Sequence, residues 1–428
     1  MTTERTQSTW LWKALALLAA FLVLLTVGGQ RVLAADTPAK VTGLEQTGDY
    51  TTSVDISWDA VVANDIRYEV DISSTAGSHG SRTEDAGTST SDYIYNLSAG
   101  CTYYISVRAY VQEWVSGTGY VYTYGEYSDQ IEVVTRPASA PTSVSQTSAT
   151  TTSITISWPT VSGANSYLVK YYPSGSSSSS ALSKTTTSNK VKITGLSKNT
   201  KYYFYVYAQC VSSTTGYTAT TSGSAYSSAL PVLPTKVTGV TWRYDWLNIN
   251  SASFSCNERA SAEGYQYYIY SYSNTSKKIK SGTTTSYSSI TVKSSKLKQN
   301  KFYAIKIRAY ITIDGVKKYG EWSSLTYFGS QPKTVKITKS SGKLKMSWSK
   351  VSGATSYTIY VSTSKPSDTS DMTKVKTTTK TSYTLTKLKK KKISKSKTYY
   401  VMVIANRKVG SKTYKSISSL GSLTYYKK

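Results

Sequence analysis

Residues able to carry nucleophilic, acid–base or metal chemistry are scarce in this 428-residue chain, which has one His and three Cys. A catalytic triad needs a His to take the proton from its nucleophile, and zinc or iron centres use clusters of His and Cys. His79 lies in Gly77-Ser78-His79-Gly80, a composition typical of a solvated loop. Cys101, Cys210 and Cys256 are scattered, and we expect them to be buried thiols that form no bridge. The sequence therefore predicts no catalytic residue, no metal site, no cofactor and no enzyme activity.

Charge is the feature with the clearest chemical meaning, because the chain has 51 Lys and Arg against 23 Asp and Glu. Residues 37–136 carry a net charge of −9, residues 137–234 carry +6, residues 235–332 carry +9 and residues 333–428 carry +21. Selection for solubility alone would not produce such a gradient, so the gradient favours attraction of the C-terminal segment to a polyanion. The alternative is that the charge serves solubility only.

The densest positive cluster lies in the last segment, which holds 22 Lys and a single Arg. Lys is a hydrated point charge, whereas Arg supplies a planar fork for bidentate recognition. This composition indicates diffuse attraction to an anionic polymer rather than recognition of a small-molecule substrate. The candidate polyanion-binding residues are Lys389, Lys390, Lys391, Lys392, Lys395 and Lys397.

Aromatic residues give a second set of candidate ligand contacts. One group, predicted to lie in a loop, comprises Trp114, Tyr120 and Tyr122, and the other alternates along a strand as Trp242, Tyr244 and Trp246. Exposed aromatic rings bind sugars or protein partners, but alternating aromatics on a strand also form core or cross-strand pairs. The sequence is compatible with ligand contact and with core or cross-strand packing for both groups.

The segments that position these candidate residues belong to a sequence repeat. Val54–Trp58 recurs as Ile154–Trp158, Ala252–Cys256 and Leu344–Trp348, at steps of 100, 98 and 92 residues. Each copy alternates apolar and polar residues with period two, which predicts a half-buried strand. Repeats at a fixed period indicate a tandem architecture, and Trp58, Trp158 and Trp348 are predicted to be buried.

A second landmark of the repeat is an apolar residue followed six positions later by Tyr. It occurs as Leu97 with Tyr103, Leu196 with Tyr202 and Leu297 with Tyr303. In the fourth copy Leu388 lacks this Tyr, and four Lys intervene before Ile393, which has the six-residue spacing to Tyr399. Either the loop is enlarged there or Ile393 takes the role of the Leu.

The first 34 residues read as a signal peptide. Arg5 and Lys13 flank a polar start, an apolar run follows from Ala14 to Val27, and Val32-Leu33-Ala34 gives small residues at the cleavage positions. Fourteen residues at helical rise reach ~21 Å, short of the ~30 Å core of a bilayer. An uncleaved anchor is the alternative, and cleavage after Ala34 or Ala35 are both open. We expect an exported chain with no transmembrane anchor after cleavage, secreted or cell-wall-associated.

The Trp of the second strand, the Leu-x5-Tyr spacing and the Tyr-Gly-Glu-(Tyr/Trp)-Ser sequences at Tyr124–Ser128 and Tyr319–Ser323 together resemble the fibronectin type III family. Unpaired Cys in an exported chain point to the tandem proteins of this kind that Gram-positive bacteria secrete. The resemblance implies an all-β chain of four immunoglobulin-like antiparallel β-sandwiches. We expect them at 37–136 (acidic), 138–233, 235–331 and 332–428 (strongly basic), after the signal peptide at 1–34.

These observations predict a non-catalytic binding or spacer protein that is secreted or associated with the cell envelope. Its basic C-terminal copy would attach to an anionic polymer such as wall teichoic acid. The alternative is a carbohydrate-binding or adhesin role, in which the exposed aromatics contact a glycan or protein ligand. Binding of extracellular nucleic acid by the same Lys is a further alternative, but no aromatic stacking platform lies in the Lys run.

Overall fold

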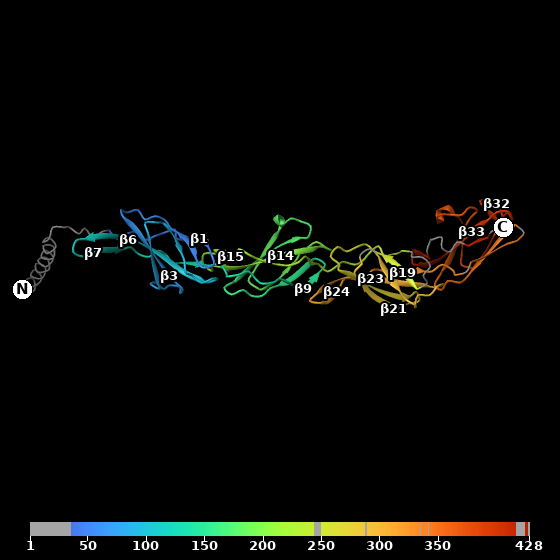
Figure 1. The fold of residues 1–428 in the computed structure, drawn as a ribbon, viewed down its shortest axis with the longest axis horizontal. Coiled ribbons are helices and arrows are strands. Elements are labelled where there is room, and N and C mark those ends of the chain that lie inside the picture. Colours follow the sequence, from blue (N-terminus) through green and yellow to red (C-terminus); the bar gives the residue numbers. More distant parts are fainter. Residues whose placement is uncertain are drawn as a thin grey trace, which may run out of the picture. The chain divides into compact units, whose positions relative to one another are not determined.

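The computed structural model of the chain describes residues 36–243, 250–286, 289–333, 335–340, 342–416 and 424–426 (Figure 1). The predicted signal peptide lies outside these residues. The described residues up to Ser139, with Ser162–Asn165 and Gln209–Thr221, form one compact unit, and the remainder from Ala140 onward forms a second. Among the described residues, no helix is long and apolar enough to cross a membrane.

The first sandwich consists of a three-stranded and a five-stranded antiparallel sheet. The smaller sheet has the order β1 (Glu45–Asp49), β2 (Val54–Ser57), β5 (Ser91–Ile94). The larger sheet has the order β4 (Arg82–Gly87), β3 (Ile66–Ser73), β6 (Thr102–Val115), β7 (Gly119–Tyr124), and β8 (Ile131–Val134) also pairs with β6. Strand β2 contains the alternating motif found in the sequence, and its Val54 and Ile56 are fully buried.

The same pair of sheets recurs three more times. The second copy combines β9 (Ser145–Thr150), β10 (Ser153–Ser157) and β13 (Lys190–Ile193) with β11 (Ser166–Pro173), β12 (Leu182–Thr186), β14 (Lys201–Val211), β15 (Thr218–Thr220), β16 (Ala225–Tyr226) and β17 (Leu230–Pro231). The third combines β18 (Thr241–Arg243), β19 (Ser251–Ser255) and β22 (Ile290–Lys293) with β20 (Gly264–Ser271), β21 (Asn274–Thr284), β23 (Phe302–Ile313), β24 (Val316–Tyr319) and β25 (Thr326–Gly329).

The fourth copy has the same two sheets and one addition. Its sheets are β26 (Val335–Ser340), β27 (Lys343–Trp348) and β30 (Ser382–Leu385), and β28 (Ser356–Ser362), β29 (Thr373–Thr378), β33 (Tyr399–Val409), β34 (Lys412–Lys415) and β35 (Thr424–Tyr426). The addition is a separate two-stranded sheet of β31 (Lys387–Leu388) and β32 (Lys391–Lys392). The fold class predicted from the sequence, four tandem antiparallel β-sandwiches, is confirmed.

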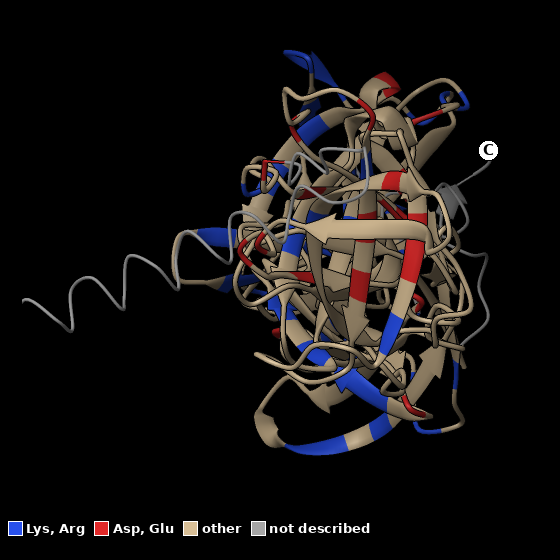
Figure 2. Ribbon diagram, turned by 90° about the vertical axis from the view of Figure 1, so that its left-hand side faces the viewer, with Lys and Arg blue, Asp and Glu red and all other residues tan. Residues whose placement is uncertain are grey.

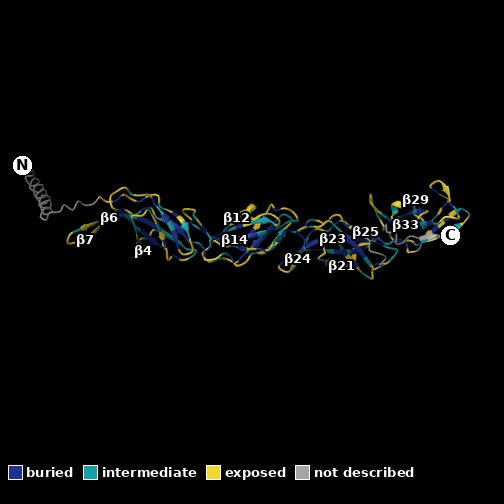
Figure 3. Ribbon diagram, turned by 45° about the horizontal axis from the view of Figure 1, so that its top comes forward, coloured by how far each residue is buried: buried dark blue, intermediate teal, exposed yellow. Residues whose placement is uncertain are grey.

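A buried Trp lies in the core of three sandwiches, as predicted; Figure 3 colours the buried interiors dark blue. Trp58, Trp158 and Trp348 are 5%, 3% and 6% exposed. Each indole meets the edge or tilted face of a buried Tyr at ring-centroid distances of 5.4, 5.3 and 5.6 Å. The indole N–H of all three has no hydrogen-bond partner, so these side chains contribute through apolar packing rather than through the polar atom.

The third sandwich has a different aromatic core, because Cys256 replaces the Trp and is only half-buried. Its aromatic contacts centre on Phe328, whose ring centroid is 4.9 Å from that of Phe254 and 5.6 Å from that of Trp242. Trp242 is partly buried and packs against this core. Strands β18 and β25 therefore contribute large aromatic side chains to the core of the third sandwich.

The apolar residue six positions before a Tyr closes one corner of each sandwich. The backbone N–H of the residue after it donates to the Tyr hydroxyl: Ser98 to Tyr103 at 2.8 Å, Ser197 to Tyr202 at 2.9 Å and Lys298 to Tyr303 at 2.6 Å. In the fourth copy the donor is Ser394 and the acceptor Tyr399, at 3.0 Å. Ile393 therefore takes the role of the Leu, and the loop before it is enlarged as well.

Replacing the core Trp should destabilise its sandwich selectively. We expect Trp158→Ala to lower the free energy of unfolding of the second sandwich by about 3–5 kcal/mol, because the change removes a buried side chain and leaves a cavity. Hydrogen exchange of peptides from β10 and β14 would measure the loss. Tyr226→Ala is the matched control, since Tyr226 lies on β16 of the same sandwich and is 73% exposed. An equal effect of the two changes would contradict the assignment of Trp158 to the core.

Candidate functional site

The Lys run in the fourth sandwich forms a hairpin, which we call the lysine hairpin (Lys387–Lys392). Lys387 pairs with Lys392 and Leu388 with Lys391, so Lys389 and Lys390 make a two-residue turn. Their φ angles are 48° and 67°. Two-residue hairpin turns with positive φ at both positions are usually made by Asn-Gly, because a Cβ is strained in the left-handed region. Two consecutive Lys at this position are therefore held in a conformation that their own backbone preference disfavours.

The base of the lysine hairpin is anchored in the core while its charges face solvent. Leu388 and Ile393 are buried and belong to the core cluster of the fourth sandwich. Beyond Ile393 the chain is held by Lys339, whose Nζ donates to the carbonyl oxygen of Lys395 at 2.6 Å and of Lys397 at 3.3 Å. All six Lys predicted to bind a polyanion are exposed. The structure thus brings the six together on one enlarged corner loop.

The acidic residues of the fourth sandwich do not neutralise this loop. Asp368 and Asp371 lie around a short 3-10 turn, Thr369–Asp371, and accept hydrogen bonds from the turn itself. The hydroxyl of Thr369 lowers the pKa of Asp368, and that of Ser367 lowers the pKa of Asp371. Within the described residues, no carboxylate forms an ion pair with Lys389, Lys390, Lys391, Lys392, Lys395 or Lys397. Asp368 and Asp371 therefore do not compensate the positive charge of the lysine hairpin.

The neighbouring sheet β26–β27–β30 extends this basic region. Its outer face carries exposed Lys336, Lys343 and Lys345, while the alternate residues face the core. The turn from β26 to β27 adjoins the loop, since a Cβ built on Gly342 would be 3.8 Å from the carbonyl oxygen of Ile393. Figure 2 colours the basic residues blue on the ribbon. The lysine hairpin therefore begins beside a sheet face that is itself positively charged.

The first aromatic group lies on strands rather than in the loop that the sequence predicted. Trp114 of β6 pairs with Tyr120 of β7, and Tyr110 pairs with Tyr124, so these side chains and that of Tyr122 share one face of the hairpin. We call the exposed set Trp114, Tyr120, Tyr122 and Tyr124 the aromatic ribbon; the exposures are 67%, 56%, 48% and 38%. The guanidinium of Arg108 lies 3.9 Å from the ring centroid of Tyr124. In the second group, Trp242 packs on the core, and Tyr244 and Trp246 lie outside the described residues.

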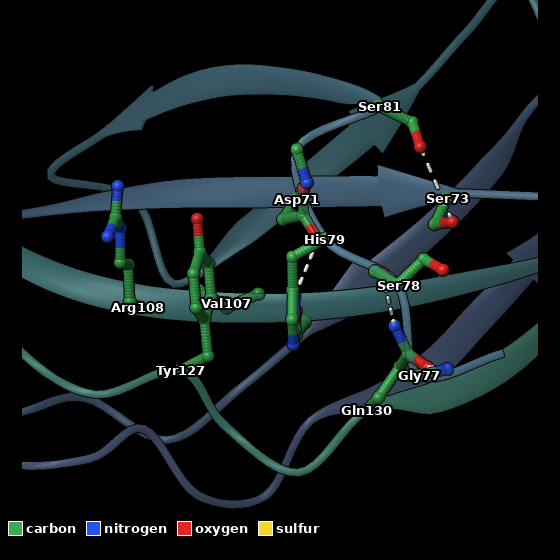
Figure 4. A network of polar contacts seen from close by, with 12 residues as sticks. Asp71, Ser73, Gly77, Ser78, His79, Ser81, Val107, Arg108, Tyr127 and Gln130 are labelled. Atoms are coloured by element: carbon green, nitrogen blue, oxygen red, sulfur yellow. Dashed lines mark hydrogen bonds and ion pairs between the residues drawn. The ribbon is translucent and has the colours of Figure 1, made fainter. Parts of the chain in front are cut away.

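His79 makes hydrogen-bond and stacking contacts that a solvated loop residue would lack (Figure 4). Its Nδ1 lies 2.8 Å from Oδ2 of Asp71, whose side chain is fully buried, and 3.1 Å from Oγ of Ser106. Its ring stacks on Tyr127 at 4.7 Å, and burial together with a hydrogen bond to Glu69 raises the pKa of Tyr127 to about 12. A catalytic triad places Asp on Nδ1 and Ser on Nε2. Here both contact Nδ1, so the three residues do not have triad geometry.

The three Cys are free thiols in the structure. Cys210, at the end of β14, is buried against Val134 of β8 and Ala219 of β15. Burial first, and then the proximity of Cys101 and Glu132, raises the pKa of the Cys210 thiol to about 11. Cys101 and Cys210 belong to separate copies of the sequence repeat, but both lie in the first compact unit. Cys256 is half-buried, and burial raises its pKa as well.

Comparison with known proteins identifies one of the four copies. Residues 139–224 match the fibronectin type III domain. No curated protein matches the chain. Similar solved structures include the FN1–FN3 domains of chicken CNTN1, with 21% identity over 68% of this chain and 98% of that chain and a TM-score of 0.26. Another is a two-domain fibronectin type III segment of chicken tenascin, with 21% identity over 44% of this chain and 99% of that chain and a TM-score of 0.24.

Relieving the turn of the lysine hairpin should stabilise the fourth sandwich. We expect the double change Lys389→Asn, Lys390→Gly to raise its free energy of unfolding by about 1 kcal/mol, because Asn-Gly adopts positive φ at lower cost. Urea unfolding would measure the gain. The control is Lys389→Ala, Lys390→Ala. It removes the same charge but keeps a Cβ at both positions, so positive φ stays unfavourable. A similar gain in the control would show that charge repulsion, not backbone strain, was relieved.

The thiol of Cys210 should react slowly and in a pH-dependent manner. With a pKa of about 11, only about one thiol in a thousand is ionised at pH 8, and the thiolate is the reactive form. We expect iodoacetamide to label Cys210 more slowly than the less buried Cys101 in the native chain, with the Cys210 rate rising about tenfold per pH unit below pH 11. Peptide mass spectrometry would measure both rates. Equal rates in the native chain would contradict the burial of Cys210.

Proposed function

We propose that the chain is a non-catalytic binding and spacer protein, secreted or associated with the cell envelope, whose fourth sandwich attaches to an anionic polymer. The observation that supports this proposal best is the lysine hairpin. The corner loop that contains it presents six exposed Lys, with no carboxylate paired to them in the described residues: Lys389, Lys390, Lys391, Lys392, Lys395 and Lys397. Wall teichoic acid is one polymer of this class.

The choice of a polymer rather than a small anion follows from the side chains. Lys ammonium groups are hydrated and mobile, and they attract phosphate-like groups as point charges without fixing their orientation. No pair of Arg forks or buried polar groups in the loop would hold a small ligand. A repeating polyanion gains from many such contacts at once, because each contact releases condensed counterions. The strained Lys389–Lys390 turn supports a binding role, since backbone strain of this kind persists mainly where function favours it.

The test removes six positive charges from the corner loop and compares the effect on binding with the removal of six positive charges from the third sandwich. The full mature chain would be measured for binding to heparin, a surrogate polyanion, with Lys389, Lys390, Lys391, Lys392, Lys395 and Lys397 replaced by Gln. The control replaces six exposed Lys of the third sandwich by Gln: Lys277, Lys278, Lys280, Lys293, Lys296 and Lys298. Both variants lose six charges, so their difference reports the site and not the net charge.

We expect the loop variant to bind more weakly and with a shallower dependence on salt, because fewer counterions are released. Its unfolding free energy should change little, since exposed charges contribute little to stability. The control should keep most of the affinity. Equal loss in the two variants would show that binding follows net charge alone, and salt-independent binding would exclude the electrostatic mechanism.

A second candidate function is glycan binding by the aromatic ribbon, favoured by the exposure of its four rings. Flat aromatic faces on one side of a hairpin can stack against sugar rings, and the guanidinium of Arg108 packs beneath Tyr124 of this group. Glycan-array binding that survives high salt and is lost in Tyr122→Ala would support this function. Binding that persists in that variant would exclude the ribbon as the contact.

A further inference from the structure

The four sandwiches differ in how they protect the last strand of the larger sheet, and the first sandwich leaves it unprotected. The equivalent edge strands are β7, β15, β24 and β34, each paired with the long preceding strand. An exposed edge offers unpaired N–H and C=O groups that can pair with another chain. Proteins normally block such edges with Lys, Pro, bulges or very short strands.

Three of the four edges carry one of these protections. Strand β24 contains Lys317 and Lys318, and β34 begins and ends with Lys412 and Lys415. Strand β15 is three residues long, and its Ala219 is buried. The edge strand of the larger sheet is therefore either short or Lys-containing in the second, third and fourth sandwiches.

Strand β7 has none of these features. It runs for six residues, Gly-Tyr-Val-Tyr-Thr-Tyr, without charge or Pro, and pairs with β6 without a register shift. Among the described residues, no strand pairs with its other edge. Tyr120, Val121, Tyr122 and Tyr124 are all exposed. Short uncharged segments rich in Tyr and Val pair readily when they lie at an edge.

We propose that β7 pairs antiparallel with β7 of a second copy of this chain, forming a two-fold symmetric dimer through the edges of the two larger sheets. Antiparallel pairing centred on Tyr122 sets Tyr120 of one copy opposite Tyr124 of the other, and Val121 opposite Thr123. These are aromatic and β-branched cross-strand pairs, which stabilise sheets. The strand is therefore complementary to itself, and a two-fold contact needs no more than one such patch. The face that carries the aromatic ribbon stays open and becomes continuous across the two copies.

Charge distinguishes this dimer from other modes of association. The first copy has a net charge of −9, so two first sandwiches repel each other and their pairing should strengthen as salt is added. Attraction between the acidic first copy of one chain and the basic fourth copy of another would weaken with salt. Polyanion binding by the lysine hairpin also weakens with salt, so failure of one proposal does not mimic failure of the other.

The experiment is sedimentation of the full mature chain over a concentration series at about 50 and 500 mM salt, where the screening length falls from roughly 14 to 4 Å. We expect a weak dimer that is more populated at high salt. Tyr122→Lys should raise the dimer dissociation constant by about tenfold or more, because the two introduced ammonium groups face each other across the symmetry axis. The control is Val316→Lys on the equivalent strand β24, where Val316 is 54% exposed; it should change nothing.

A gain-of-function variant makes the test independent of lost folding. Removing the protection of β24 by Lys317→Val with Lys318→Tyr should add a second self-association site and produce species larger than the dimer. A wild-type chain that stays monomeric at every concentration would overturn the proposal. So would a dimer that persists in Tyr122→Lys or weakens as salt increases, since either result assigns the contact to another surface.

Discussion

The hydrogen bond from a backbone N–H to one Tyr hydroxyl closes a corner between the two sheets of every sandwich, and the other features depend on it. The bond runs at 2.6 to 3.0 Å in all four copies and always follows a buried Leu or Ile. A second Tyr supports the opposite side, where Tyr68, Tyr167, Tyr265 and Tyr357 each accept a backbone N–H at 2.8 to 3.0 Å. A buried hydroxyl that lacked its partner would cost free energy, so these bonds fix where the loops begin.

The distribution of ion pairs explains why charge has different consequences at the two ends of the sequence. The five ion pairs that Lys and Arg form with carboxylates in the described residues lie in the first sandwich, for example Arg67 with Asp85 and Arg108 with Glu69. Its few basic residues are thus used internally. The fourth sandwich has almost no carboxylates, and its two Asp are occupied by their own turn. The six exposed Lys of its enlarged corner loop have no carboxylate partner within the described residues.

The sequence was sufficient to predict the sandwiches, because period-two alternation and the spacing of Trp and Tyr are local and repeated. It predicted a loop for the aromatic group at Trp114–Tyr122, where β6 and β7 form a hairpin. The period-two spacing of Tyr120, Tyr122 and Tyr124 was the signal for a strand. The contacts of His79 were beyond prediction, because Asp71 and Ser106 reach it from strands 8 and 27 residues away and only the sheet register brings them together. The lysine hairpin could not be predicted either, because a run of Lys has no periodicity. The apolar residues Leu388 and Ile393, which are buried, were the remaining signal.

The corner bond also explains how the fourth sandwich gained its extra hairpin without losing its core. The two ends of a hairpin lie side by side, so inserting one before Ile393 closes the chain with little added entropy cost, and Ser394 and Tyr399 keep their bond. The same apolar residue and Tyr are present in the other three copies. Each of these corners is therefore a position at which the chain can accept a new hairpin and acquire a new surface chemistry, while the sandwich beneath it stays the same.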